Sequence, residues 1–169
     1  MTRSSRSVEV CESLADIPAE QWNRLVEGDP LLSHEYLSAL HDTGCAHRRT
    51  GWLPQFVILR EASELVGAMP LYLKSHSYGE YVFDWAWADA YHRHGLEYYP
   101  KLVSAIPFTP VTGTRLLAQA ADDRRLLLAT ALELAKTRAA SSLHCLFPTE
   151  REAQEMRQSG LMLRQGVQV

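Results

Sequence analysis

The stretch QFVILREASELVGAMPLYLK, residues 55–74, decides the predicted fold. Residues 55–60 form a run rich in β-branched and aromatic side chains, and residues 65–74 return to an apolar character after the polar connection 61–64. Two such runs joined by a short link predict a β-hairpin. Pro70 has no N–H to donate to a strand neighbour, so we expect a bulge or a sheet edge there.

Before this hairpin the pattern predicts one strand and two helices. Residues 7–14 alternate apolar and polar side chains, as in a half-buried strand. A helical spacing of apolar residues begins near Pro18, with Asp16 placed as a cap. Ser33 is expected to cap a second helix, which Gly44 ends.

After the hairpin the chain alternates between helix and strand. Residues 81–85 suit a short strand, while Asp84 could instead cap a helix over 86–94, and the pattern leaves both open. The remaining expected elements are a strand at 101–108, a helix from Asp122, a strand at 142–147, a helix at 150–158 and a strand at 161–169. This order predicts an α/β domain, a mixed sheet with helices on both faces.

Length and charge narrow the classes of protein. A chain of 169 residues suits a single domain, 1–169. Its net charge of −3 gives no basic footprint for nucleic acid. No apolar run approaches the ~20 residues that span a bilayer, and the N-terminus has no apolar signal-peptide core. Three distant cysteines fit a reduced, cytoplasmic protein.

The order of elements resembles the GNAT (acyl-CoA N-acyltransferase) fold, whose central sheet is mixed and mostly antiparallel. Segments 65–95, 98–117 and 142–168 are similar to FemAB-like proteins, described as peptidoglycan biosynthesis/recognition proteins or predicted N-acyltransferases. The resemblance covers most of the chain. It implies transfer of an acyl or aminoacyl group to an amine, on a cell-wall precursor or another small molecule. It also implies a longer protein in which a second GNAT-like domain is the partner of this one.

The resemblance also implies where an acyl-CoA donor would bind. In GNAT enzymes, a glycine-rich loop after the fourth strand cradles the pyrophosphate with backbone N–H groups. Residues 108–117 hold one glycine there, and the candidate cofactor-binding residues are Thr112, Gly113, Thr114 and Arg115. The alternative is a structural loop, because Asp122 and Asp123 at the next helix start would repel a phosphate. An aminoacyl-tRNA donor stays open, although the acidic charge disfavours it.

Ten of the 15 aromatic residues lie between Tyr72 and Phe108, so we expect this segment to carry function. Acyl transfer to an amine needs positioning and a general base, for which a carboxylate or histidine suffices. The candidate catalytic residues are Glu80, Asp84, Asp89 and His92. The candidate substrate-binding residues are Tyr78, Trp85, Trp87, Tyr98, Tyr99 and Phe108. The structural alternative is that the rings form core and the polar groups satisfy their edges.

Two further classes of function stay open. A non-catalytic recognition module would bind a glycan or peptide on its aromatic surface. A metal-dependent hydrolase would use His92 and His94, which converge on a strand but diverge by about 200° on a helix. The segment favours a helix, so we predict no metal site. The expected strands 101–108 and 142–147 distinguish an acyltransferase from the other classes. A pair that is splayed apart favours an acyl-CoA site between the strands, and a closed pair argues against one.

Overall fold

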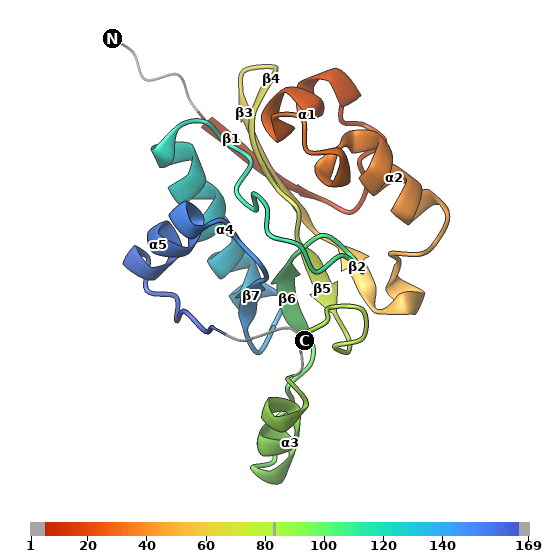
Figure 1. Cartoon of the computed structure of the whole chain (residues 1–169), viewed down its shortest axis with the longest axis vertical. Helices are drawn as coiled ribbons and strands as arrows, with labels where there is room; N and C mark the ends of the chain where they lie inside the picture. Colours follow the sequence, from red (N-terminus) through yellow and green to blue (C-terminus); the bar gives the residue numbers. More distant parts are fainter. Residues whose placement is uncertain (1–5, 83, 166–169) are drawn as a thin grey trace.

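Strand β3 (Phe56–Glu61) runs through the centre of the molecule, with helices on both sides of it (Figure 1). The computed structural model describes residues 6–82 and 84–165. The other elements are β1 (Arg6–Cys11), α1 (Ala19–Val26), α2 (His34–Asp42), β2 (Trp52–Pro54), β4 (Glu64–Met69), β5 (Tyr72–Lys74), α3 (Trp85–Arg93), β6 (Lys101–Ser104), α4 (Ala121–Thr137), β7 (Leu143–Cys145) and α5 (Glu150–Gln158). Short 3₁₀ helices cover Pro30–Leu32 and Arg48–Thr50. The predicted α/β class is confirmed.

The strands form two hydrogen-bonded ladders, in the orders β1-β3-β4 and β2-β5-β6-β7. Every pair is antiparallel except β6 with β7, so the sheet structure is mixed and mostly antiparallel. The predicted hairpin is confirmed as β3–β4. The expected single strand over 65–74 is wrong, because the chain breaks at Pro70 into β4 and β5, which lie in different ladders. Proline lacks the N–H that would have continued the ladder.

The core has two parts, one on each side of β3. Phe56 and Ile58 face a cluster that includes Trp22 of α1 and Leu37 of α2. The alternate residues Val57 and Leu59 face the second cluster, which includes apolar residues of α4 and α5. This alternation follows from the two-residue period of a strand. It explains why β3 is apolar along most of its length, as a strand covered on both faces must be.

Helix ends follow the predicted capping at one site and depart from it at two others. Ser33 Oγ accepts from Tyr36 N at 3.3 Å, which confirms the cap on α2. The expected cap by Asp16 is wrong, because α1 begins after Pro18 with no side-chain cap. Asp84 precedes α3 as expected, yet it makes no capping hydrogen bond. Its carboxylate is used elsewhere, as the next subsection describes.

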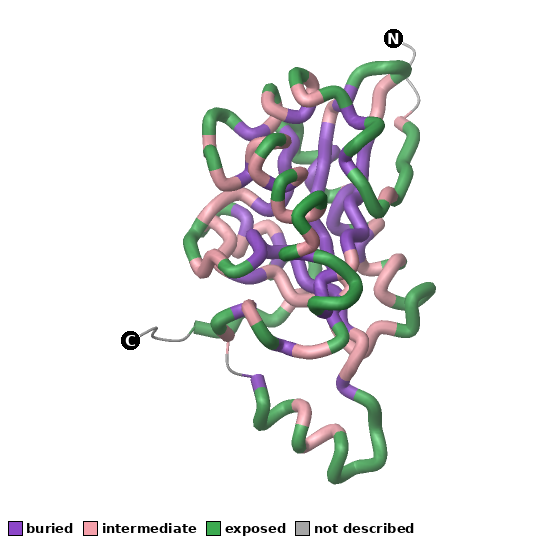
Figure 2. The backbone as a smooth tube through the Cα atoms, turned by 90° about the vertical axis from the view of Figure 1, so that its right-hand side faces the viewer, coloured by how far each residue is buried: buried purple, intermediate pink, exposed green. Residues whose placement is uncertain are grey.

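The second half of the chain decides one open alternative and differs from expectation elsewhere. Of the alternatives for residues 81–94, the helix is confirmed as α3 and the strand is wrong. Strand β6 ends at Ser104 rather than at 108. Residues 161–165 form no strand, and the rest of the predicted strand, 166–169, lies outside the described residues. Helix α3 projects from the body of the molecule (Figure 1) and has no buried residue along its length (Figure 2).

Candidate functional site

Two lysines face one another inside the protein. Lys74 at the end of β5 is the register partner of Lys101 at the start of β6. Both side chains are 0% exposed. Burial of an ammonium group costs several kcal/mol unless opposite charge and hydrogen bonds replace water. The pair therefore requires acidic partners, and the segment that follows β5 supplies them.

Lys101 has a complete set of hydrogen-bond acceptors. Its Nζ donates to Glu80 Oε2 at 2.8 Å, to Ser77 Oγ at 2.9 Å and to Asp84 Oδ2. Tyr98 also donates its hydroxyl to Asp84 Oδ2, at 2.7 Å. All three ammonium protons are thus used. We call Lys74, Lys101, Glu80 and Asp84 the lysine–carboxylate cluster.

Lys74 is held less completely. Its Nζ donates to Tyr78 O at 3.1 Å, lies 3.9 Å from Glu80 Oε1 and sits 3.6 Å from the centre of the Trp52 ring. The ring face attracts the ammonium through a cation–π interaction. Within the described part of the chain, Glu80 Oε1, Asp84 Oδ1 and Trp52 Nε1 are buried without a hydrogen-bond partner. Orphaned polar atoms around one cluster mark it as a candidate site.

Burial shifts the pKa values of Lys74 and Glu80 in opposite directions. Burial lowers the pKa of Lys74 to about 7, against the attraction of Glu80. Burial raises the pKa of the Glu80 carboxyl, against the charge and hydrogen bond of Lys101. Burial also acts to raise the pKa of Asp84, but the hydrogen bonds from Lys101, Ser77 and Tyr98 outweigh it and lower that pKa. Carboxylates and amines with such displaced pKa values serve in proton transfer.

Aromatic side chains surround the cluster and continue onto the surface. Phe108 packs on Trp52 with ring centres 5.4 Å apart, and Tyr78 packs on Trp85 at 5.2 Å. Tyr78 is 66% exposed and Trp85 is 45% exposed. Such rings bind flat apolar or sugar surfaces without large loss of side-chain entropy. We call the exposed rings that contact one another or Trp52 the aromatic face: Tyr78, Trp85 and Phe108.

The structure brings two of the four candidate catalytic residues together. Glu80 and Asp84 both bind Lys101 in the cluster. Asp89 instead pairs with Arg93 on the exposed side of α3, at 3.0 Å, and His92 is exposed on the same helix. The cluster therefore lies at the base of α3, while Asp89 and His92 lie farther along it.

The candidate substrate-binding rings also divide. Tyr98 is buried and bonded to Asp84, and the half-buried Tyr99 hydroxyl pairs with Ser77 Oγ at 2.8 Å. These two rings hold the cluster in place. Tyr78, Trp85 and Phe108 are exposed and form the aromatic face, whereas Trp87 is exposed farther along α3, where Arg164 lies over its ring.

The candidate cofactor loop is built around an internal arginine. Arg115 is 0% exposed, and its guanidinium donates to Leu146 O and Val111 O at 2.8 Å and to Thr114 O at 3.0 Å. Gly113 N donates to Phe147 O at 3.1 Å. In this conformation the donors of Arg115 and Gly113 bind carbonyl groups of the protein, while Thr112 is exposed and Thr114 is partly exposed.

The strands that would flank an acyl-CoA are joined here. β6 and β7 pair in parallel through Leu102–Leu143, Val103–His144 and Ser104–Cys145. Leu146 N continues the contact by donating to Ser104 O at 2.9 Å. The pair is closed along its described length, and beyond it the Arg115 guanidinium bridges to Leu146 O.

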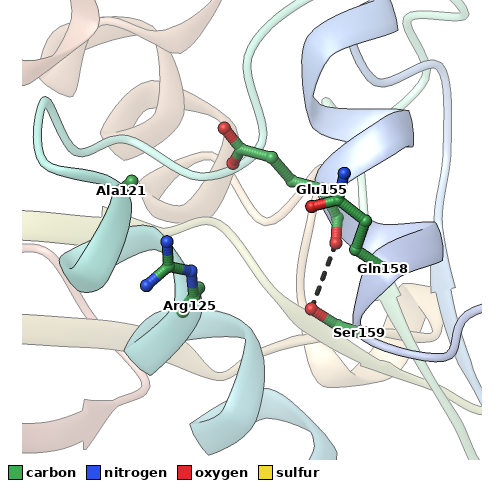
Figure 3. A pocket seen from close by; sticks show the side chains of 5 residues that line it. All are labelled: Ala121, Arg125, Glu155, Gln158 and Ser159. Carbon is green, nitrogen blue, oxygen red and sulfur yellow. Dashed lines mark hydrogen bonds between the residues drawn. The ribbon is translucent and has the colours of Figure 1, made fainter.

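Other parts of the described chain offer weaker sites. No group of three or more histidine, cysteine or acidic side chains among the described residues could hold a metal ion. A shallow hollow of about 270 Å³ lies between α4 and α5 and is lined by Ala121, Arg125, Glu155, Gln158 and Ser159 (Figure 3). Its Glu155 carboxylate is already paired with Arg124. No described helix is long and apolar enough to cross a membrane.

Residues 13–169 match the family model of the FemAB-like proteins, described as peptidoglycan biosynthesis/recognition. The chain belongs to the FemAB-like family. The matched range contains the whole lysine–carboxylate cluster and the aromatic face. The FemAB-like assignment implies a peptidoglycan precursor as substrate. A search of curated proteins found no match.

Sequence reasoning missed both lysines of the lysine–carboxylate cluster. A lysine within an apolar strand pattern is normally read as a surface residue whose stem packs and whose head reaches water. One signal was present: Lys74 and Lys101 are two of only three lysines in the chain. Both lie within the aromatic segment from Tyr72 to Phe108 that was expected to carry function.

Proposed function

We propose that this FemAB-like chain is the acceptor-binding domain of an N-acyltransferase that acts on an amine of a cell-wall precursor. The single observation that carries the proposal is that the exposed rings of Tyr78, Trp85 and Phe108 lie next to the lysine–carboxylate cluster, which they meet through the Tyr78 carbonyl and the Trp52 ring. The face offers rings for sugar or peptide groups, and the cluster offers Lys74, whose buried amine has a pKa of about 7. We place this activity in the cytoplasm, where the precursor amine would be made.

The acyl donor in this proposal is an acyl-CoA thioester. Its pyrophosphate would meet the loop that holds Thr112, Gly113, Thr114 and Arg115 only after Arg115 released its carbonyl partners. We therefore propose that the acyl donor is bound mainly by the second GNAT-like domain of a longer chain. This domain would then orient the acceptor amine toward the donor.

Calorimetry with a soluble disaccharide-pentapeptide muropeptide tests the acceptor role. We expect saturable binding by the wild-type chain and about tenfold weaker binding by Trp85→Ala, the loss of one stacked ring. Val8→Ala is the matched control, because Val8 is 40% exposed on β1, away from the aromatic face. The proposal is wrong if the wild-type chain gives no binding, or if both variants bind like it.

A recognition module without catalysis is the second candidate, and the closed β6–β7 pair favours it. Both candidate functions predict muropeptide binding, so experiments with the acyl donor are needed to distinguish them. Acetyl-CoA and a long-chain acyl-CoA are added to the chain, alone and together with the muropeptide. Formation of an N-acyl muropeptide, read by mass spectrometry, supports the transferase, whereas binding without product in a chain that includes the second domain supports the recognition module.

A further inference from the structure

The ammonium group of Lys74 makes fewer hydrogen bonds than that of Lys101. Lys101 Nζ donates to three oxygens, whereas the described contacts give Lys74 Nζ one hydrogen bond, to Tyr78 O. An ammonium has three donors, so two of them have no acceptor at hydrogen-bond distance in the described chain. The facing oxygen Glu80 Oε1, 3.9 Å away, is itself buried without a partner. A donor and an acceptor left incomplete side by side could both bond to a polar group of a ligand.

Phe108 and Gly79 meet beside the Trp52 ring that Lys74 contacts, and we call these two residues the roof. Lys74 lies on the Trp52 ring, and Phe108 covers the same ring. Phe108 meets the loop after β5 through its N–H, which donates to Gly79 O at 3.2 Å, and through its ring. The fit is tight, because a Cβ added at Gly79 would lie 2.6 Å from the Phe108 ring and 3.3 Å from Trp52 Nε1. One hydrogen bond and one ring contact therefore join Phe108 to the segment that follows Lys74.

The backbone of this roof is under strain. Phe108 has a φ of 58° and Tyr81 has the same value, in the left-handed region that non-glycine residues occupy at a cost. Such conformations gather at sites that open or clamp a ligand. Phe108 is also 39% exposed, so little burial opposes its movement. The roof can part without breaking a strand pair, because both residues lie outside the strands.

We propose that Lys74 is the catalytic base of the acyl transfer, reached when the contact between Gly79 and Phe108 opens. This inference rests on the proposed function above. The acceptor nitrogen bonds to the acyl carbon, and the carbon–sulfur bond of the thioester breaks with its electron pair leaving on sulfur. The proton that the acceptor nitrogen loses goes to the neutral Lys74 amine.

The charges that face Lys74 suit a base at neutral pH. They are Lys101 across the strand pair, Glu80 and Asp84 from the loop before α3, and His76 on the segment after β5. Burial lowers the pKa of Lys74 to about 7, with Lys101 lowering it and the two carboxylates raising it. A base is most effective when its pKa lies near the working pH. Burial and the Lys74 charge also lower the pKa of His76.

Competitive acetylation of the wild-type chain tests the inference, because its lysines provide their own standards. The probe is a trace of acetic anhydride at pH values from 6 to 10, with each lysine followed by peptide mass spectrometry. Lys136 is the exposed standard, with a side chain 75% exposed on α4, and Lys101 is the sealed standard. We expect Lys74 to label with a midpoint near pH 7, well below the midpoint of Lys136.

Two variants test the roof. Phe108→Ala should speed the labelling of Lys74 about tenfold, the effect of removing one packed ring, and leave Lys136 unchanged. Val111→Ala is the control, because Val111 is as exposed as Phe108 on the same loop. Labelling of Lys74 no faster than that of Lys101 in all three proteins would overturn the inference. A Lys74 midpoint equal to that of Lys136 would also overturn the inference. This comparison needs only the wild-type chain, so it can be made even if Phe108→Ala does not fold.

This test is separate from the test of the proposed function. Absence of muropeptide binding refutes the acceptor role and leaves the labelling of Lys74 unaffected. Once an acceptor is known, Lys74→Met should remove the rise of rate with pH near 7 while muropeptide affinity stays within about twofold. Equal pH profiles for Lys74→Met and the wild-type chain would overturn the inference directly.

Discussion

Replacing Lys101 with methionine removes the one cation that both buried carboxylates share. Methionine fills much of the same volume, so the change tests charge and hydrogen bonding more than packing. Glu80 Oε2 loses its 2.8 Å partner, and Asp84 keeps only the hydrogen bonds from Tyr98 and Ser77 among the side-chain contacts described above. Lys74, 3.9 Å from Glu80, is too far to replace it by a direct hydrogen bond.

The expected loss is about 3–5 kcal/mol of unfolding free energy, the usual cost of removing one partner from a buried ion pair. Domains of this kind are stable by about 5–15 kcal/mol in total, so Lys101→Met should unfold a large fraction of the chain under mild conditions. Urea denaturation followed by tryptophan fluorescence measures the loss. Lys136→Met, which breaks an exposed i,i+3 pair with Glu133, is the control and should change little.

A double variant sharpens this test. Adding Glu80→Gln to Lys101→Met removes one of the two unpaired charges, so it should recover about 1–3 kcal/mol of the loss. A loss below about 1 kcal/mol for Lys101→Met, equal to that of Lys136→Met, would refute the argument that the cluster is a tightly coupled ionic centre.

Three other predictions concern stability. The pKa of Lys74 is lowered from 10.5 to about 7, so between these pH values the folded chain binds fewer protons than the unfolded chain. The unfolding free energy should therefore rise from pH 7 to pH 9. Lys74→Met should flatten that slope in urea titrations, and equal slopes for the two proteins would contradict the argument. Arg115→Met leaves three carbonyls short of a donor and should cost about 3 kcal/mol, read as a lower Tm, whereas Arg138→Met on the surface should not. Thr149→Ala removes the capping box with Glu152 at the start of α5 and should cost about 1 kcal/mol in urea; an unchanged midpoint would show that the cap is dispensable.

The sequence predicted the elements that local chemistry determines. The hairpin β3–β4 and the helix α5 follow from apolar period, polar links and Gly160. The cap by Ser33 was predicted for the same reason, since a hydroxyl meets an N–H three residues away. Strand β2 was not predicted, because three residues show no period and form a strand only by pairing with β5.

The site depends on contacts that no local pattern encodes. Lys101 meets Lys74 only through the register of β5 with β6, 27 positions apart in the chain. Glu80 and Asp84 were singled out as candidate bases for their residue type and their aromatic neighbours, yet their lysine partners were not. Arg115 was expected to bind phosphate because arginine commonly does so. Its burial against Leu146 O arises from a loop that returns to β7, which sequence spacing does not reveal.

The passage of the chain from β4 to β5 across Pro70 has a consequence for insertions and deletions. Residues 64–74 supply a strand to each ladder, one on either side of Pro70, so a residue gained or lost at Pro70 would turn each following side chain to the opposite side. Lys74 would then leave the cluster, and its position would be taken by Leu73 after an insertion or by Ser75 after a deletion. The tight turn at Ala62 and Ser63 has no such coupling, since it only closes a hairpin. Length variation among relatives should therefore gather at that turn and avoid the eleven positions that follow it.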